Sequence, residues 1–168
     1  MLLRAADRHF RTLGNRSSHR FDALSKCFIQ RFDAFTVPVD AAADERGHVN
    51  GRLTLGENLA DAGGMAMTRR LLKQPVSTSC RLRSVGKSLP ALPNMQMFSP
   101  DQLYYLSFAQ VWCSQMRPER QKKELFVNPH APAQWRVKGT VMNDDHFAQA
   151  FSCASDQPMH PAQKCKIW

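Results

Sequence analysis

The chain has 168 residues, of which 43% are hydrophobic and 22% are charged, the size and composition of one globular domain. No apolar run reaches the roughly 20 residues that a membrane-spanning helix needs, and the stretch from Met1 to Arg8 lacks the apolar core of a signal peptide. The net charge of +9 would suit an acidic partner, but the basic residues are scattered and no nucleic-acid-binding motif is present. Nucleic acid is therefore not an expected partner, and a basic module for acidic partners is a minor alternative.

The first half of the chain predicts two helices separated by a loop. Residues 1–20 are basic and have no clear pattern, whereas apolar side chains recur every three to four positions from Phe21 to Phe32, which predicts a helix. Residues 37–50 contain loop-forming residues and are expected to form a loop. A second helix is expected from Thr54, where Thr54 and Glu57 have the spacing of a capping box, a purely structural role for Glu57.

Residues 66–94 are atypical, because positions 69–87 hold six basic residues and no acidic one. Beyond them, Ser99, Pro100 and Gln102 predict the start of a nearly uncharged helix, which is expected to be buried on most sides. A short basic helix should begin at Pro118, followed by a proline-containing loop over residues 128–132. Residues 136–142 alternate like a strand, and a last short helix is expected from residue 143 or 144 to residue 151.

Four sequence blocks carry a resemblance to a known family. The run V-N-G-R-L-T-L-G-E-N-L-A-D-A-G-G at residues 49–64 resembles the V-N-G…T-L-G-E-N-(I/L)-A-D-x-G-G block of the neprilysin and endothelin-converting-enzyme family of zinc metallopeptidases. The other blocks are F-A-Q-V-W-C from Phe108, P-H-A-P-A-Q-W-R-V from Pro129, and M-H-P-A-Q-K-C-K-I-W at residues 159–168. The resemblance covers residues 21–66 and 89–168, and it identifies the chain as the C-terminal part of such a peptidase.

The resemblance implies a mainly α-helical fold with a short β element, and a division of the chain into two parts. Residues 1–20 would be a poorly matched N-terminal stretch, and residues 21–168 a partial catalytic domain. Within that domain, residues 66–94 would be either a lineage-specific loop or a frame-shifted or mis-spliced stretch, and the second explanation is favoured because the match resumes abruptly near Leu89.

The resemblance also implies a zinc site of which this chain holds one ligand. Glu57 matches the third protein ligand of the catalytic Zn²⁺, and Asp61, one helical turn later, matches the carboxylate that orients a histidine ligand. The two histidine ligands and the general base belong to an H-E-x-x-H motif upstream in the family. The 168 residues contain no such motif.

Two further pairs of residues match the substrate side of the family's active site. His130 matches the donor that hydrogen-bonds the oxyanion of the tetrahedral intermediate, and Arg136 matches the side chain that holds a substrate carbonyl. Val111 and Trp112 match residues that line the pocket for a large apolar side chain after the scissile bond. Asn128 stands where the family usually has Asp.

The five cysteines do not have the spacing of a zinc ribbon or a C-x-x-C motif, and their odd number leaves reduced thiols or disulfides with missing partners as alternatives. The resemblance implies a disulfide between Cys27 and Cys165, and bonds from Cys113 and Cys153 to cysteines upstream, while Cys80 matches nothing. It also implies an extracellular or cell-surface location, as part of the ectodomain of a type II membrane protein.

The sequence thus predicts a zinc metalloendopeptidase fragment that hydrolyses internal bonds of peptides by zinc-activated water when it is joined to the N-terminal half of the same peptidase. Alone, with one ligand and no base, it is expected to bind zinc poorly and to be inactive. The alternative is a non-catalytic module that binds peptides or other partners.

Overall fold

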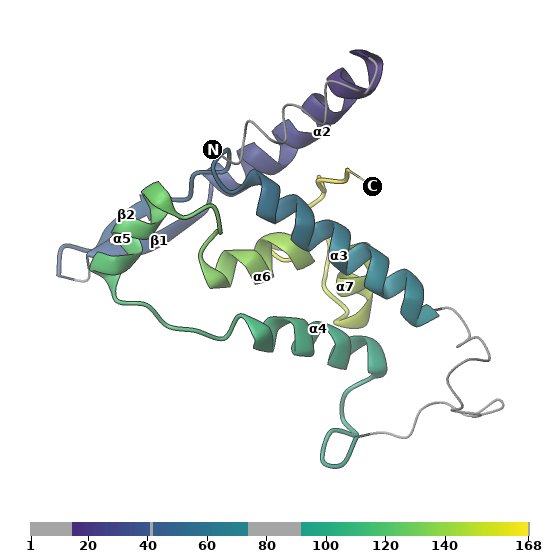
Figure 1. Ribbon diagram of the computed structural model, residues 1–168. Helices are drawn as coiled ribbons and strands as arrows, with labels where there is room; N and C mark the ends of the chain where they lie inside the picture. Colours follow the sequence, from purple (N-terminus) through teal and green to yellow (C-terminus); the bar gives the residue numbers. More distant parts are fainter. Residues whose placement is uncertain (1–14, 41, 74–91, 168) are drawn as a thin grey trace.

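A computed structural model of the chain describes residues 15–40, 42–73 and 92–167. In these ranges the chain is mainly helical with a small two-stranded sheet, as predicted (Figure 1). The elements are α2 (Asn15–Asp33), β1 (Thr36–Asp40), β2 (Glu45–His48), α3 (Leu55–Lys73), α4 (Pro100–Val111), α5 (Pro118–Val127), α6 (Ala133–Val141) and α7 (Asp145–Ala150). Cys80 lies outside the described residues, as does much of the atypical segment.

The β element lies where a loop was predicted. Strands β1 and β2 form an antiparallel hairpin in which Thr36 pairs with His48, with an irregularity between Pro38 and Asp40. Val37 and Val39 are almost fully buried and the residues between and beside them are not, which is the alternation of a half-buried strand. Proline is tolerated here because the sheet has only two strands, so that each strand is an edge.

The start of α3 differs from the capping-box alternative for Glu57. The amide of Thr54 donates to the carbonyl of Asn50, and the Thr54 hydroxyl donates to the same carbonyl while it accepts from the Asn58 side chain. A turn over residues 50–54 and the Asn58 side chain therefore satisfy the Thr54 groups that a capping box would use, and the Glu57 carboxylate lies beside His130 instead.

Helix α3 is longer than the matching motif, because it continues into the atypical segment as far as Lys73. In that extension Arg69 pairs with Asp144 at 3.8 Å, and Asp144 also accepts from the Tyr105 hydroxyl at 2.7 Å. Burial, and next the bond to Asp144, raise the pKa of Tyr105 far above its usual range. The first part of the atypical segment is thus packed against the C-terminal elements.

The predicted start of α4 is confirmed. Ser99 is the N-cap, Pro100 follows it, and the side chains of Ser99 and Gln102 form a capping box. The expectation that this helix is buried on most sides is wrong. Tyr105 is buried, but Leu106 is 39% and Val111 is 73% exposed, because α4 packs on α6 and α7 along one face only.

The strand predicted over residues 136–142 is also wrong, because these residues belong to α6. Buried positions in this segment include Arg136, Gly139 and Thr140, which have the three-to-four-residue spacing of a helix face. Gly139 lies against the rings of Phe32 and Phe35, where an added Cβ would come within 2.6 Å and 2.9 Å of ring carbons.

The predicted basic helix at Pro118, the loop at 128–132 and the last helix, capped by Asp144, are confirmed.

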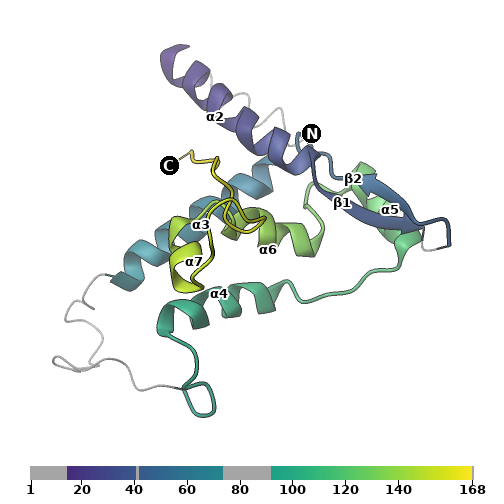
Figure 2. The same ribbon diagram turned by 180° about the vertical axis from the view of Figure 1, so that it is seen from behind.

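Two apolar clusters hold these elements together. The larger joins α2, the hairpin, α3, α5 and the C-terminal tail, and its most buried members are Phe28, Phe32 and Val37. The smaller joins α3, α4, α6 and α7 around Tyr105. Figure 2 shows the C-terminal segment running back past α6 toward α2, where the predicted disulfide between Cys27 and Cys165 is formed.

Candidate active site

Arg136 is the centre of the cluster that the structure builds from the predicted site residues. It is on α6, and its side chain is only 8% exposed. Asp61 and Glu57 reach it from α3, and the ring of Trp112 reaches it from the end of α4. His130, in the loop between α5 and α6, joins the cluster through Glu57. Residues far apart in the sequence are thus brought together.

Asp61 and Arg136 form a bidentate ion pair. Nε and Nη2 of Arg136 donate to the two carboxylate oxygens of Asp61, each at 2.7 Å, and the side chains are 8% and 11% exposed. The guanidinium also lies over the Trp112 ring, 3.8 Å from its centroid. Such a planar fork fixes both partners in orientation as well as in distance. The side chain of Arg136 is therefore held rigidly.

The position of Arg136 is set by its neighbour Trp135. The indole N–H of Trp135 donates to the Thr36 carbonyl at 2.9 Å, and the ring stacks on Phe35 with 4.0 Å between centroids. These contacts attach the first turn of α6 to the hairpin. The sheet that the sequence did not predict is thus part of the support of the site.

Glu57 and His130 meet at the solvent-facing side of the cluster. Nε2 of His130 lies 3.2 Å from Oε2 of Glu57, and the side chains are 46% and 40% exposed. Nη2 of Arg136 lies 3.7 Å from the same oxygen. The Glu57 carboxylate is therefore accessible to a further ligand, and it is more exposed than that of Asp61, whose side chain is 11% exposed.

Sequence reasoning missed two residues that hold His130. Asn128 accepts from the backbone N–H of His130 at 2.9 Å and lies 3.0 Å from its Nδ1, and the Asn128 amide donates to Glu124 at 2.9 Å. Asn128 is also the C-cap of α5, through its backbone N–H and the Glu124 carbonyl. The spacing of four residues between Glu124 and Asn128 is the signal that could have revealed this pair.

Val111 and Trp112 take different positions. Trp112 is half-buried beneath the Arg136 guanidinium, whereas Val111 is 73% exposed on α4. A pocket wall around Val111 would require further residues opposite it.

The described part of the chain does not contain a complete metal site. No group of three or more His, Cys, Asp or Glu side chains lies close enough together in it to hold a metal ion. Catalytic zinc usually has three protein ligands and one open position. Glu57 has the chemistry and the exposure of one such ligand, and the residues around it do not supply the others.

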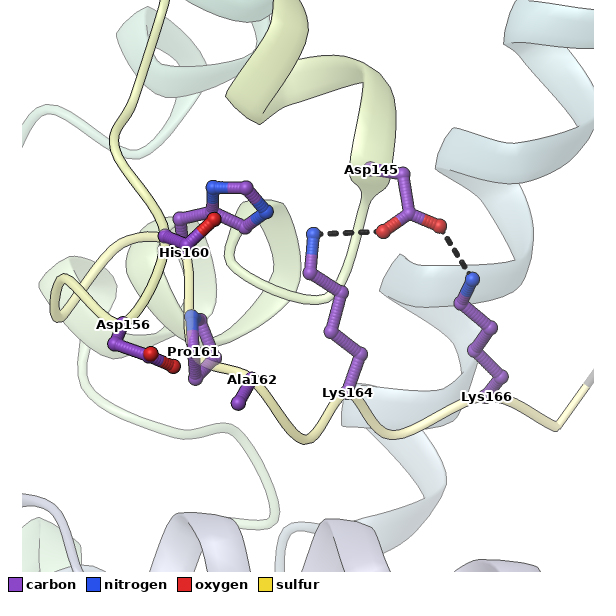
Figure 3. A pocket seen from close by; sticks show the side chains of 8 residues that line it. Asp145, Asp156, His160, Pro161, Ala162, Lys164 and Lys166 are labelled. Atoms are coloured by element: carbon purple, nitrogen blue, oxygen red, sulfur yellow. Dashed lines mark hydrogen bonds and ion pairs between the residues drawn. The ribbon is translucent and has the colours of Figure 1, made fainter.

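A cavity of about 520 Å³ lies elsewhere, at the C-terminal tail, and none of the cluster residues lines it. In Figure 3, Lys164 and Lys166 approach Asp145 from the tail, and Nζ of Lys164 is 2.8 Å from a carboxylate oxygen. Hydrogen bonds from these two lysines lower the pKa of Asp145 to about 2. Both lysines are already paired with the Asp145 carboxylate. We therefore interpret these ion pairs at the cavity as structural contacts.

The sequence matches a family model described as Peptidase family M13 over residues 6–167, and the chain belongs to that family. It is 34% identical over 154 residues to endothelin-converting enzyme 1 of Homo sapiens, and 34% identical over 152 residues to neprilysin-21 of Caenorhabditis elegans. These matches cover 92% and 90% of this chain, but only 18% of each relative. The chain therefore spans less than a fifth of the length of these relatives.

Solved structures show the same fold. The zinc metalloprotease Zmp1 of Mycobacterium tuberculosis, in complex with an inhibitor, is 28% identical with a TM-score of 0.68, and the match covers 89% of this chain and 22% of that one. The Haemonchus galactose-containing glycoprotein complex is also 28% identical, with a TM-score of 0.76 over 91% of this chain and 24% of that one. The fold and the metallopeptidase family predicted from the sequence are confirmed. Among the described helices, none is long and apolar enough to cross a membrane.

Proposed function

We propose that this chain is the C-terminal catalytic portion of a zinc metalloendopeptidase that cleaves internal bonds of peptides. The observation that carries the proposal is the convergence of Glu57, Asp61, His130 and Arg136, four residues predicted from two separate sequence blocks, into one cluster. Family membership and the similarity to a zinc metalloprotease support the same chemistry.

Glu57 would be the protein ligand that this chain contributes to Zn²⁺, since its carboxylate is 40% exposed and next to the substrate-side donors. When bound, the metal polarises a water molecule and the scissile carbonyl. Asp61 holds Arg136 in place, and its carboxylate oxygens retain lone pairs for the imidazole of a metal ligand.

His130 and Arg136 would act on the substrate. A donor placed at the oxygen on which charge develops stabilises the transition state more than the ground state, and His130 Nε2 faces the Glu57 carboxylate from a suitable position. The guanidinium of Arg136 would donate a hydrogen bond to a substrate carbonyl, and the Trp112 ring beneath it would keep it in place. Val111 would lie beside the pocket for an apolar side chain of the substrate.

The partner that would complete the site is the N-terminal half of the same peptidase, with its H-E-x-x-H motif. Leu106 and Val111 on α4 are exposed in this chain, as is Phe126 at 76% on α5, and they offer apolar surface for that half to cover. Because the histidine ligands and the base are absent from the 168 residues, we expect this chain alone to bind zinc poorly and to hydrolyse no peptide.

Metal analysis tests the proposal directly. The purified 168-residue chain is dialysed against trace zinc and measured by atomic absorption, beside a longer polypeptide in which an H-E-x-x-H segment precedes it. We expect about one zinc and peptidase activity for the longer polypeptide only. The substitution E57Q should remove both, while E119Q, at an exposed carboxylate on α5, should change neither. One tightly held zinc on the short chain alone would refute the assignment of a single ligand.

The second candidate is a non-catalytic module that binds peptides or other partners, favoured by the absence of a complete metal site in the described residues. An antibody against residues 101–117 can separate the two by capturing the native polypeptide for size determination and peptide mapping. A product near 19.1 kDa favours the module, whereas a larger product with additional upstream peptides favours the peptidase.

We also propose an extracellular or cell-surface location. The disulfide between Cys27 and Cys165 supports it, because such bonds form and persist in oxidising compartments. Cys113 and Cys153 have no disulfide partner within the described residues, and we propose that they bond to upstream cysteines.

A further inference from the structure

The sequence contains one acceptor motif for N-linked glycosylation, at Asn15. Asn15, Arg16 and Ser17 have the pattern Asn-x-Ser, in which the middle residue is not proline. The other asparagines lack Ser or Thr two positions later: Asn50, Asn58, Asn94, Asn128 and Asn143. A motif this short also arises by chance, so its meaning depends on its surroundings in the structure.

The surroundings of the motif are exposed. The motif lies at the start of α2, and Figures 1 and 2 both show this end of the helix extending away from the other helices and the sheet. Ser17, whose hydroxyl completes the motif, is exposed, and so are Arg16 and Arg20. Among the described side chains of α2, the first buried one is Ser25. A bulky, hydrophilic group can therefore be attached at this end without displacing the core.

The other end of α2 makes the contacts that support the candidate active site. The Asp33 carboxylate accepts from the N–H of Gly51 at 2.6 Å, shortly before α3 begins. At a rise of 1.5 Å per residue, Asn15 lies about 18 Å along the helix from Cys27, which forms the disulfide with Cys165. A group attached to Asn15 is therefore remote from the cluster around Arg136.

The start of α2 also differs from the surfaces that another part of the protein would cover. The exposed large apolar side chains of the described residues lie on α3, α4 and α5 and in the segments before and after α4, and none lies on α2. Exposed apolar patches mark interaction surfaces, whereas a polar and charged surface is typical of contact with water. The start of α2 thus has the character of a surface that remains in solvent.

We propose that Asn15 carries an N-linked oligosaccharide, and that this end of α2 stays at the surface when the N-terminal half of the peptidase is present. The side-chain nitrogen of Asn15 forms a bond to the anomeric carbon of a lipid-diphosphate-linked oligosaccharide. The bond from that carbon to the diphosphate oxygen breaks, the lipid diphosphate leaves with the electron pair, and a base of the transferase takes one amide proton. The inference rests on the proposed extracellular location, because this donor is used in the lumen of the secretory pathway.

The experiment is secretion of the 168-residue chain from eukaryotic cells behind a cleavable signal peptide, beside the longer polypeptide that includes an H-E-x-x-H segment. Each product is treated with peptide N-glycosidase F, which removes the oligosaccharide and leaves aspartate at position 15. Peptide mass detects that aspartate, and gel mobility of the 168-residue chain detects the loss of the oligosaccharide. We expect aspartate at position 15 in both wild-type products after treatment.

The matched variants change the motif or its immediate neighbour. N15Q and S17A should abolish the mobility shift of the 168-residue chain completely, because each removes a required part of the motif. S17T keeps the hydroxyl and should keep the shift, as should S18A, which changes a serine outside the motif. Formation of the disulfide between Cys27 and Cys165, seen by mobility with and without reductant, reports that each variant folds.

Unmodified Asn15 in a secreted wild-type chain that has formed its disulfide would overturn the proposal, as would a shift that persists in S17A. Modification of the 168-residue chain but not of the longer polypeptide would overturn the placement of this end of α2 at the surface.

The native polypeptide, captured by the antibody against residues 101–117, separates this inference from the proposed location. A product that is labelled on the surface of intact cells but has unmodified Asn15 overturns the glycosylation and leaves the location standing. A failure of the peptidase assignment would be seen separately, in the metal and activity measurements.

Discussion

The substitution D61A tests how the cluster around Arg136 is held together. Asp61 accepts two charge-assisted hydrogen bonds of 2.7 Å from a guanidinium that is 8% exposed. Removing one partner of a buried ion pair leaves an uncompensated charge and typically costs about 3–5 kcal/mol. The Trp112 ring at 3.8 Å and the Glu57 carboxylate at 3.7 Å remain as partial compensation. We therefore expect a loss near the lower end, about 3 kcal/mol.

The assay is urea unfolding followed by circular dichroism, with wild type, D61A, R136M and the double variant D61A/R136M. With a slope of about 2 kcal/mol per molar urea, D61A should lower the midpoint by about 1.5 M. The double variant should recover much of the loss, because it buries no unpaired charge. A loss below about 1 kcal/mol for D61A, or a double variant as unstable as the sum of both single ones, would refute the assignment of a coupled, buried pair.

Three other substitutions test the support of the site. G139A should destabilise the chain by about 1–2 kcal/mol in the same assay, since an added Cβ would lie 2.6 Å from the buried Phe32 ring and outweigh the gain in helix propensity; an unchanged midpoint would contradict this packing. C27A/C165A should cost up to about 5 kcal/mol, because the bond joins positions 138 residues apart, and equal unfolding of the wild-type chain with and without reductant would contradict it. Because the pKa of Asp145 is lowered to about 2 in the folded chain, below the roughly 3.9 of an unfolded Asp, its contribution is present above about pH 4 and lost as the pH falls toward 2. Unfolding midpoints measured across that range should decline less for D145N, and parallel curves would argue against the contribution.

Local signals in the sequence predicted most helices. Ser99, Pro100 and Gln102 were recognised because a capping box depends only on residues three positions apart. The hairpin was not predicted because Pro38 is typical of a loop. A proline can occupy this strand because the sheet has no third strand on either side, which the sequence does not show. Helix α6 was predicted as a strand, since its short run of alternating residues fits either periodicity and only packing against Phe32 and Phe35 distinguishes the two.

The candidate site shows the same division between local and distant information. Glu57, Asp61, His130 and Arg136 were named from motifs that are short and contiguous, and the structure brings them together. That Asp61 holds Arg136 across 75 positions could not be predicted, because nothing local to either residue specifies the partner. The exposed state of Val111 was missed for a related reason: an apolar residue on a helix does not reveal whether this chain or another covers it.

The bond between Cys27 and Cys165 encloses all the residues of the candidate site within one covalent ring. A protease that cuts the backbone once between positions 27 and 165 would therefore open the ring without releasing a fragment. A cut between α3 and α4 would place Glu57 and Asp61 on one piece and His130 and Arg136 on the other, still linked through sulfur. Such a nicked chain would migrate as one species under oxidising conditions and as two after reduction, so single-site cleavage need not dismantle the cluster.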